Sequence, residues 1–253
     1  MGRQIIDLHA WLATPPGAYL LAWEREQISR VVADVFGFHA LQLGLPELDA
    51  LAANRMPHRW LATEFPHDRA AMVSNFAALP FPANSLDLVV MPHTLELTAD
   101  PHAALREVER VLVPEGRVVI CGFNPMSLWG FRQKRAHLYR RMGWEHMFLP
   151  ETGDFIGYLR MRDWLRLLGL EIELGEFGCY RPALSSLGLL QRFAWMDSAG
   201  SRWWPILGAV YCLVAVKRVR GVTLLNPAWK TTKRVSGASI SVAGRAGSTR
   251  DSA

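Results

Sequence analysis

The segment from residue 86 to 123 constrains the fold more than any other part of the chain. It holds the apolar run LDLVVMP, the longer segment DPHAALREVERVLVPEG and a second apolar run, RVVICGF. Both apolar runs are typical of strands covered on both faces. The segment between them has helical spacing, with Asp100 as the expected N-cap and Pro101 at the first helical position. A strand, a helix and a strand joined by short loops predict an α/β fold with a mainly parallel sheet.

The same alternation extends to both sides of this segment. A leading helix is expected over 16–37, ended by Gly37, because its apolar residues share one broad face: Leu20, Leu21, Ile28, Val31, Val32 and Val35. Strands are expected at HALQL, HRWLATEF, AAMVSNF, the end of RMRDWLRLLGLEIELGEF and 206–216. Further helices are expected at SLWGFRQKRAHLYRRMG and before Gly169. The fold class is therefore predicted to be a three-layer, doubly wound α/β arrangement.

Composition limits the domain organisation and the choice of partners. We expect one domain over 1–230 and a disordered basic tail over 231–253, which is rich in Ser, Gly and Ala. The formal net charge is +5, but eight Lys and Arg and a single acid lie from Lys217 onward. Residues 1–216 therefore keep 20 basic and 22 acidic groups. The charge gives no reason to expect a nucleic-acid partner.

The cysteines and the apolar runs indicate a cytoplasmic location. Cys121, Cys179 and Cys212 stand far apart in apolar surroundings, which fits buried thiols in a reducing compartment, and they show no zinc spacing. The first residues contain an acid and a histidine where a secretory signal would be apolar. The longest apolar run, 203–216, has about 14 residues, and a membrane span needs about 20. A buried strand is favoured there, with a peripheral membrane contact through its two Trp residues as the alternative.

Ligands of open α/β sheets bind outside the carboxyl ends of the strands. In this chain those ends are predicted at Gly44, Glu64, Asn75 with Phe76, Met91 to Thr94, and Cys121 to Asn124. A flat, largely apolar ring with one hydrogen-bonding edge would fit beside Phe76, Leu79 and Phe81. The alternative is that these three residues are core residues around a proline turn.

The segment 75–125, NFAALPFPANSLDLVVMPHTLELTADPHAALREVERVLVPEGRVVICGFNP, resembles class I S-adenosylmethionine-dependent methyltransferases of the type 11 group. In that group a strand end with an acid is followed by LPF, a turn, S-F-D-x-V, a strand and a helix that ends in E-x-x-R-V-L-x-P-G-G. The later RDWLRLLGLEIE resembles the group more loosely. The resemblance implies a seven-stranded sheet with helices on both faces. It also implies S-adenosylmethionine across the carboxyl ends of the first half of the sheet.

The resemblance also assigns site residues. It implies cofactor-binding positions at Gly44, in the loop after the first strand; Glu64, as the acid for the ribose; Asn75 and Phe76, at the adenine; and Met91, His93 and Thr94, beside the methionine part. Asp87 falls where the group uses an acid structurally. His93 is the candidate general base, and a capping or packing histidine is the alternative. No metal site is expected, because His93, Glu96 and His102 lack a further ligand.

Two features depart from the pattern of the group. The loop that reads G-x-G-x-G in the group is LGLPELD here, with Pro46 and Leu48 at the other two glycine positions. Their side chains would narrow the approach to the cofactor. The second feature is the connection between HRWLATEF and AAMVSNF, which is shorter than the ten or more residues of a parallel crossover. Either these strands pair differently, or one of the two strand predictions is wrong.

Three functions follow from these residues. The first is a methyltransferase for a small apolar or aromatic acceptor, with a pocket built by 125–160 and 176–204. The aromatic residues expected to serve it are Trp129, Tyr139, Trp144, Phe148, Phe155, Tyr158, Tyr180, Phe193 and Trp195. The second is a catalytically inactive binding protein of the same fold, in view of LGLPELD. The third is an RNA-directed methyltransferase that uses the Arg-rich segment 132–141 and the basic tail.

Overall fold

The computed structural model describes residues 8–140, 149 and 155–218. The chain divides into the unit Met1–Val219 and a second unit, Arg220–Ala253, and all described residues belong to the first. The predicted tail at 231–253 lies outside the described residues, as do Trp144, Phe148 and the side chain of Tyr139. Among the helices that are described, none is long and apolar enough to cross a membrane.

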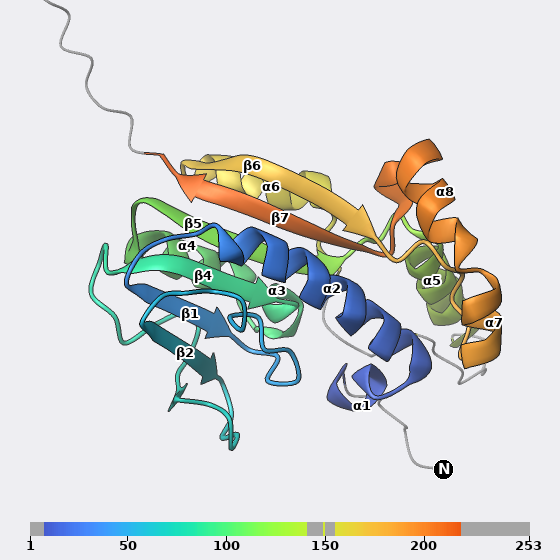
Figure 1. Cartoon of the computed structure of the whole chain (residues 1–253), viewed down its shortest axis with the longest axis horizontal. Coiled ribbons are helices and arrows are strands. Elements are labelled where there is room, and N and C mark those ends of the chain that lie inside the picture. Colours follow the sequence, from blue (N-terminus) through green and yellow to red (C-terminus); the bar gives the residue numbers. More distant parts are fainter. Residues whose placement is uncertain (1–7, 141–148, 150–154, 219–253) are drawn as a thin grey trace, which may run out of the picture. The chain divides into compact units, whose positions relative to one another are not determined.

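A single seven-stranded sheet in the order β3-β2-β1-β4-β5-β7-β6 forms the centre of the fold (Figure 1). The strands from β3 to β5 are parallel to one another, and β7 runs antiparallel to both β5 and β6. This mixed, mainly parallel sheet confirms the predicted α/β fold class. The strands are β1 His39–Leu43, β2 His58–Thr63, β3 Met72–Val73, β4 Leu86–Pro92, β5 Leu112–Phe123, β6 Leu170–Gly178 and β7 Val210–Lys217.

Helices cover both faces of the sheet, which gives the predicted three layers. Alternate residues of β4 face opposite sides. Leu88 and Val90 join a core cluster with residues of α2, whereas Val89 and Met91 join a second cluster with residues of α4. The helices are α1 Leu8–Leu12, α2 Pro15–Ala33, α3 Thr94–Leu97, α4 Pro101–Val111, α5 Leu128–Arg140, α6 Tyr158–Leu167, α7 Leu187–Arg192 and α8 Trp195–Trp203, with a 3-10 turn η1 at Pro205–Leu207.

The leading helix forms as predicted but ends at Ala33 rather than at Gly37. Gly37 has a different reason to be glycine. A Cβ atom at this position would lie 2.4 Å from Cγ of Asp87. Asp87 needs this space because its Oδ2 accepts hydrogen bonds from the backbone N–H groups of Phe38 and His39, at 2.8 and 2.9 Å. Asp87 thus ties the start of β4 to the start of β1, the structural role that was expected.

The short connection between β2 and β3 has a simple geometric explanation. The predicted strand AAMVSNF shrinks to Met72–Val73, which pairs in parallel with the last two residues of β2, Ala62 and Thr63. A full-length parallel neighbour would require the chain to return along the whole strand. Because β3 begins beside the end of β2, residues 64–71 suffice without a helix.

Candidate active site

Three segments that are distant in sequence meet at the carboxyl end of β1. Gly44 follows this strand in the left-handed region, with φ of 72°, and its N–H donates to the carbonyl of Ala62 at 2.8 Å. The hydroxyl of Thr94 donates to the carbonyl of Leu43 at 2.5 Å. A Cβ atom built at Gly44 would lie 3.5 Å from Oγ1 of Thr94 and 3.9 Å from the ring of Phe76. We call this edge, with the residues that follow β2 and β3, the donor edge, because the resemblance described above implies that the methyl donor S-adenosylmethionine binds there.

Gln42 holds the loop after β1 in place. Its Nε2 donates to the carbonyls of Gly44, Leu45 and Leu48 at 3.1, 3.0 and 2.8 Å. Its Oε1 accepts from the N–H of Ala50 at 2.9 Å. The sequence prediction missed this residue. The available signal was an amide side chain between two leucines, Leu41 and Leu43, in a predicted strand.

Several side chains of the loop after β1 are buried. Leu45 and Leu48 are each 1% exposed and belong to the cluster that contains Leu20 and Ile28 of α2. Pro46 is buried as well. Leu45 and Leu48 therefore pack in the layer beneath α2, although Leu48 also lines a cavity beside β1 and β2. That Pro46 and Leu48 narrow the approach to a ligand stays a prediction. Leu45 adopts a left-handed conformation with φ of 46°, which is unfavourable for a residue with a side chain.

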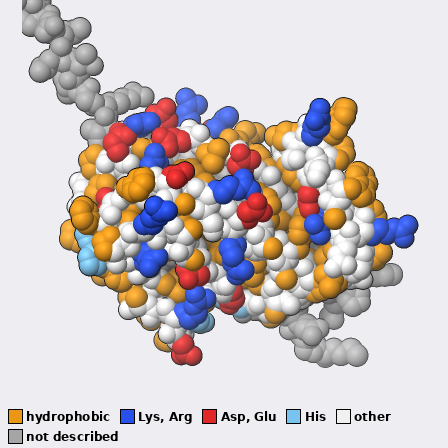
Figure 2. Space-filling model, viewed as in Figure 1, with side chains coloured by type: hydrophobic (Ala, Val, Ile, Leu, Met, Phe, Trp, Pro, Cys, Tyr) orange, Lys and Arg blue, Asp and Glu red, His pale blue; other side chains and the backbone are white. Residues whose placement is uncertain are grey.

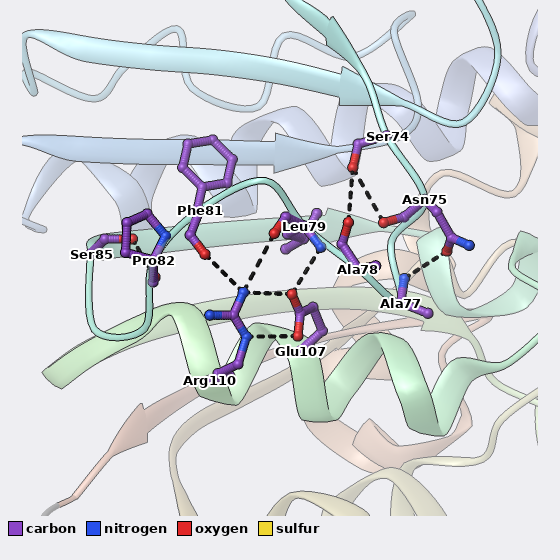
Figure 3. Close-up of polar contacts among 10 residues, drawn as sticks. All are labelled: Ser74, Asn75, Ala77, Ala78, Leu79, Phe81, Pro82, Ser85, Glu107 and Arg110. Atoms are coloured by element: carbon purple, nitrogen blue, oxygen red, sulfur yellow. Dashed lines mark hydrogen bonds and ion pairs between the residues drawn. The ribbon is translucent and has the colours of Figure 1, made fainter.

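The turn after β3 is fixed by two charged residues of α4 (Figure 3). Glu107 accepts from the N–H of Leu79 at 2.8 Å, and Arg110 donates to the carbonyl of Phe81 at 2.8 Å. The two side chains pair with each other at 2.6 Å, and this hydrogen bond with Arg110 lowers the pKa of Glu107. The motif E-x-x-R therefore holds the LPF turn. At the other end of the turn, Oδ1 of Asn75 accepts from the N–H of Ala77 at 2.8 Å.

The structure places His93 in a buried group of charges. The ring is fully buried, and its Nδ1 lies 2.7 Å from Oε2 of Glu96. Its Nε2 lies 2.8 Å from Oε1 of Glu24, an ion pair without hydrogen-bond alignment. Burial opposes the charged ring, but the two carboxylates outweigh it and raise the pKa of His93 to about 10. A protonated ring with both nitrogens held by carboxylates does not fit a general base, so the catalytic prediction for His93 is corrected to a structural one.

Glu24 is the second residue that the sequence prediction missed. It lies on the buried face of α2, one turn from both Leu20 and Ile28, and its side chain is fully buried. Its i, i+4 spacing from these two apolar residues was the available signal. Glu96 completes the group, because its Oε1 accepts from the N–H of Phe123 at 2.6 Å. The charges thus connect α2, α3 and the end of β5, between the donor edge and the second half of the sheet.

The remaining predicted cofactor-binding residues differ in their exposure. Met91 lies inside β4, paired with Ile120, and is fully buried, so its place is in the core rather than on a loop. Thr94 and Phe76 are also buried, although both lie at the donor edge. Gly44 and Glu64 are partly exposed, and Asn75 is exposed. These last three residues are the predicted ones with surface available to a ligand.

A cavity of about 440 Å³ lies beside β1 and β2, and a larger one of about 730 Å³ lies beyond the carboxyl end of β5. The larger cavity has aromatic walls from Phe155, Tyr158 and Phe177. Two of these belong to the predicted aromatic set, whereas Trp129 and Tyr180 of that set are core residues. The other residues that line it are Asn124, Pro125, Met126, Gly130, Gln133, Lys134, Gly157, Leu159, Arg160, Ile206 and Leu207. We call this space the β5–β6 cavity.

Comparison with known proteins decides the family. Residues 45–120 match the family described as "Methyltransferase domain". The chain is 30% identical to the Escherichia coli protein YafS over 229 residues. This alignment covers 89% of this chain and 87% of YafS. The chain belongs to the class I methyltransferases of the type 11 group. Members of this family use S-adenosylmethionine as the methyl donor.

Two solved structures are similar in fold to this chain, and a further curated protein is similar in sequence. An S-adenosylmethionine-dependent methyltransferase from Thermotoga maritima superposes with a TM-score of 0.55 at 16% identity, over 85% of this chain and 97% of the other. One from Archaeoglobus fulgidus gives 0.53 at 15% identity, over 78% and 94%. The malonyl-[acyl-carrier protein] O-methyltransferase of Halorhodospira halophila is 42% identical over 130 residues, which span 51% of this chain and 38% of that protein.

Gly44, Glu64 and Asn75 present surface at the donor edge to which a ligand could bind. The carboxylate of Glu64 could accept hydrogen bonds from the hydroxyls of a ribose. Within the described part of the chain its hydrogen-bond partner is the hydroxyl of Thr98, at 3.4 Å. Oδ1 of Asn75 accepts one hydrogen bond, from the N–H of Ala77, and has a second lone pair that could accept from the amine of an adenine. Gly44 lets the backbone approach closely. In the described part of the methyltransferase, no three or more His, Cys, Asp or Glu side chains lie together as a metal site would require. His102, which was considered as a possible metal ligand, packs against the ring of Trp164.

Proposed function

We propose that this methyltransferase transfers a methyl group from S-adenosylmethionine to a small apolar or aromatic acceptor bound in the β5–β6 cavity. The observation that carries the proposal is the position of this cavity. It lies at the carboxyl end of β5 and is lined mainly by residues of the predicted insertion 125–160, with Phe177 from the segment 176–204. The donor edge lies in the other half of the same sheet, with β4 between the two. The donor and the acceptor would then meet across the end of β4.

The residues of the chain would bind and orient the two reactants. We propose that Gly44, Glu64 and Asn75 hold the donor. The buried side chains of Phe76 and Thr94, which lie next to Gly44, would keep this loop in place. The donor supplies an activated methyl group on a positively charged sulfur. The protein then has to align the acceptor in line with the breaking carbon–sulfur bond and to exclude water. The buried charges of Glu24, His93 and Glu96 would hold the ends of β4 and β5 in register for this alignment.

The lining of the β5–β6 cavity favours a particular kind of acceptor. Among the described residues that line it there is no carboxylate and no imidazole, whereas Lys134 and Arg160 carry positive charge. A group that must lose a proton before it attacks would find no general base among these residues. An acceptor whose reacting atom already carries a free electron pair fits better. The apolar walls suit a ring or a chain attached to that atom.

Methyl transfer from isotopically labelled S-adenosylmethionine tests the proposal. Small molecules, protein and RNA from a bacterial extract would be separated after incubation with the enzyme. We expect label in an apolar small-molecule fraction. Met126→Trp, which adds bulk to the cavity wall, should reduce transfer at least tenfold, whereas Met126→Leu should retain it. Label in the RNA fraction instead would contradict the proposal.

A binding protein without transfer activity is the competing function. The observation that favours it is the burial of Phe76, Met91, His93 and Thr94, which leaves fewer side chains for the donor than the family pattern implies. Such a protein would bind ligands in the β5–β6 cavity while leaving all fractions of the extract unlabelled. The same labelling experiment, combined with donor binding measured by calorimetry, separates the two functions.

A further inference from the structure

The opening of the β5–β6 cavity is rimmed by exposed apolar side chains. Met126, Leu159 and Ile206 line the cavity and are also 58%, 62% and 65% exposed. Exposed apolar residues that adjoin a cavity differ from scattered surface leucines, because they extend an apolar surface from the interior to the outside. The cavity is therefore continuous with an apolar part of the surface.

The neighbouring helices enlarge this apolar surface. Two exposed tryptophans of α8 belong to it, Trp195 at 60% and Trp203 at 75%. Figure 2 shows hydrophobic and basic side chains next to one another over α7 and α8. The other exposed large apolar residues of α5, α7 and the segment after α8 are Leu128, Phe131, Leu187, Leu189, Trp204 and Leu207. We call this set, with the three rim residues, the apolar end.

Positive charge accompanies the apolar end. Over 125–135, 155–160 and 187–207 the described basic residues are Arg132, Lys134, Arg135, Arg160, Arg192 and Arg202, and the acid is Asp197. Asp197 is already neutralised, because Arg181 pairs with it at 2.8 Å and Tyr19 donates a hydrogen bond to it. The apolar end therefore presents net positive charge, although residues 1–216 as a whole have a slight acidic excess.

We infer that the apolar end docks on the surface of a bilayer that contains anionic lipids. Tryptophan is favoured at the boundary between headgroups and acyl chains, and basic side chains are attracted to anionic headgroups. A surface that combines the two binds reversibly without a membrane-spanning helix. The charge complementarity decides for an anionic bilayer rather than for a second copy of the chain, which would bring two positive surfaces together.

Docking at this end would bring the β5–β6 cavity to the membrane. Met126, Leu159 and Ile206 would face the acyl chains, so that an apolar acceptor could pass from the bilayer into the cavity. This part of the inference rests on the proposed function and makes the acceptor a lipid-like molecule. The docking itself does not depend on methyl transfer, and it can be measured without a donor.

Co-sedimentation with lipid vesicles tests the inference. The whole 253-residue chain would be mixed with vesicles of phosphatidylcholine alone or with phosphatidylglycerol added. We expect at least tenfold tighter binding to the anionic vesicles, weakened by salt. The double variant Trp195→Ser/Trp203→Ser should lose at least tenfold in affinity for them, and Lys134→Glu/Arg192→Glu should lose the preference for anionic lipid. Circular dichroism would confirm that each variant is folded.

A matched control comes from exposed aromatic residues before β1. Phe36 and Phe38 are 77% and 69% exposed and lie at the amino end of that strand. Phe36→Ser/Phe38→Ser should leave vesicle binding unchanged. The inference is overturned if the wild-type protein binds neither kind of vesicle, or if the control variant loses as much binding as the tryptophan variant. It is also overturned if sedimentation velocity shows a dimer that the tryptophan substitutions dissociate, because the apolar end would then join two copies.

Discussion

At the residue scale, His93 is the side chain whose role changes most between sequence and structure. Its ring is buried between Glu24 and Glu96, which raise its pKa from an ordinary 6.5 to about 10. Folding therefore favours the protonated ring. The stability that this provides is fully present below about pH 6.5 and is lost as the pH rises through about 10. A catalytic base would have required the opposite arrangement, a neutral ring with an accessible nitrogen.

The pH dependence of unfolding tests this role. We expect the wild-type free energy of unfolding to fall by a few kcal/mol (~2–4) between pH 6.5 and pH 10 because of this group. His93→Gln should remove most of that slope, since glutamine does not titrate. Urea unfolding at a series of pH values measures it. Equal slopes in the wild type and the variant would contradict the assignment.

Loss of the positive charge should also be costly at neutral pH. His93→Gln leaves two carboxylates buried without a counter-charge, and we expect a loss of about 3–5 kcal/mol. His102→Gln is the matched control, because His102 is exposed on α4 and loses its ring contact with Trp164 but no ion pair, so that stability should change by less than about 1.5 kcal/mol. Denaturant titration at pH 7 compares the two. A loss below about 1 kcal/mol for His93→Gln would mean that the buried charges contribute little.

At the element scale, the donor edge depends on two loops held by side chains from other elements. Glu107 and Arg110 of α4 hold the LPF turn, and Gln42 of β1 holds the loop after its own strand. Neither loop contains a helix, so these bonds substitute for the support that a helix would give. The donor edge should therefore loosen when they are removed, even where the core is untouched.

Removal of the clamp on α4 should loosen the LPF turn selectively. Arg110→Ala removes the bond to Phe81 and the partner of Glu107, with an expected loss of about 1–2 kcal/mol. Hydrogen exchange should rise in residues 75–81 and should stay unchanged in β4 and β5. Arg106→Ala on the exposed face of the same helix is the control. Unchanged exchange in the turn would show that the clamp is dispensable.

Loss of the Gln42 amide should act on the loop after β1. Gln42→Leu keeps the approximate size of the side chain but leaves several loop carbonyls without a donor, at a cost of about 2–4 kcal/mol. Donor binding, measured by calorimetry, should weaken because Gly44 lies in this loop. Wild-type donor affinity in this variant would show that the loop does not position the donor.

At the scale of the whole molecule, periodicity was enough to predict the layers of the sheet and most of its elements. The segment LDLVVMP to RVVICGF formed β4, α4 and β5, with Asp100 accepting from the N–H of Ala103 as the cap of α4. The helix ends earlier than expected, at Val111, and LVPEG belongs to β5. The length of β3 was not predictable from the sequence. Only Met72 and Val73 pair with β2, because the chain reaches this strand at its last two residues. The partners of His93 were not predictable either, since Glu24 lies some 70 residues earlier in the chain and reaches it only through tertiary packing.

The central claim is that the donor edge of this methyltransferase binds S-adenosylmethionine, and calorimetric titration with the donor tests it most directly. We expect one donor for each chain, with affinity about tenfold weaker in Glu64→Ala, where the carboxylate for the ribose is missing. Glu26→Ala, an exposed carboxylate on α2, should bind like the wild type. Absence of heat up to millimolar donor, with the protein shown to be folded, would contradict the account.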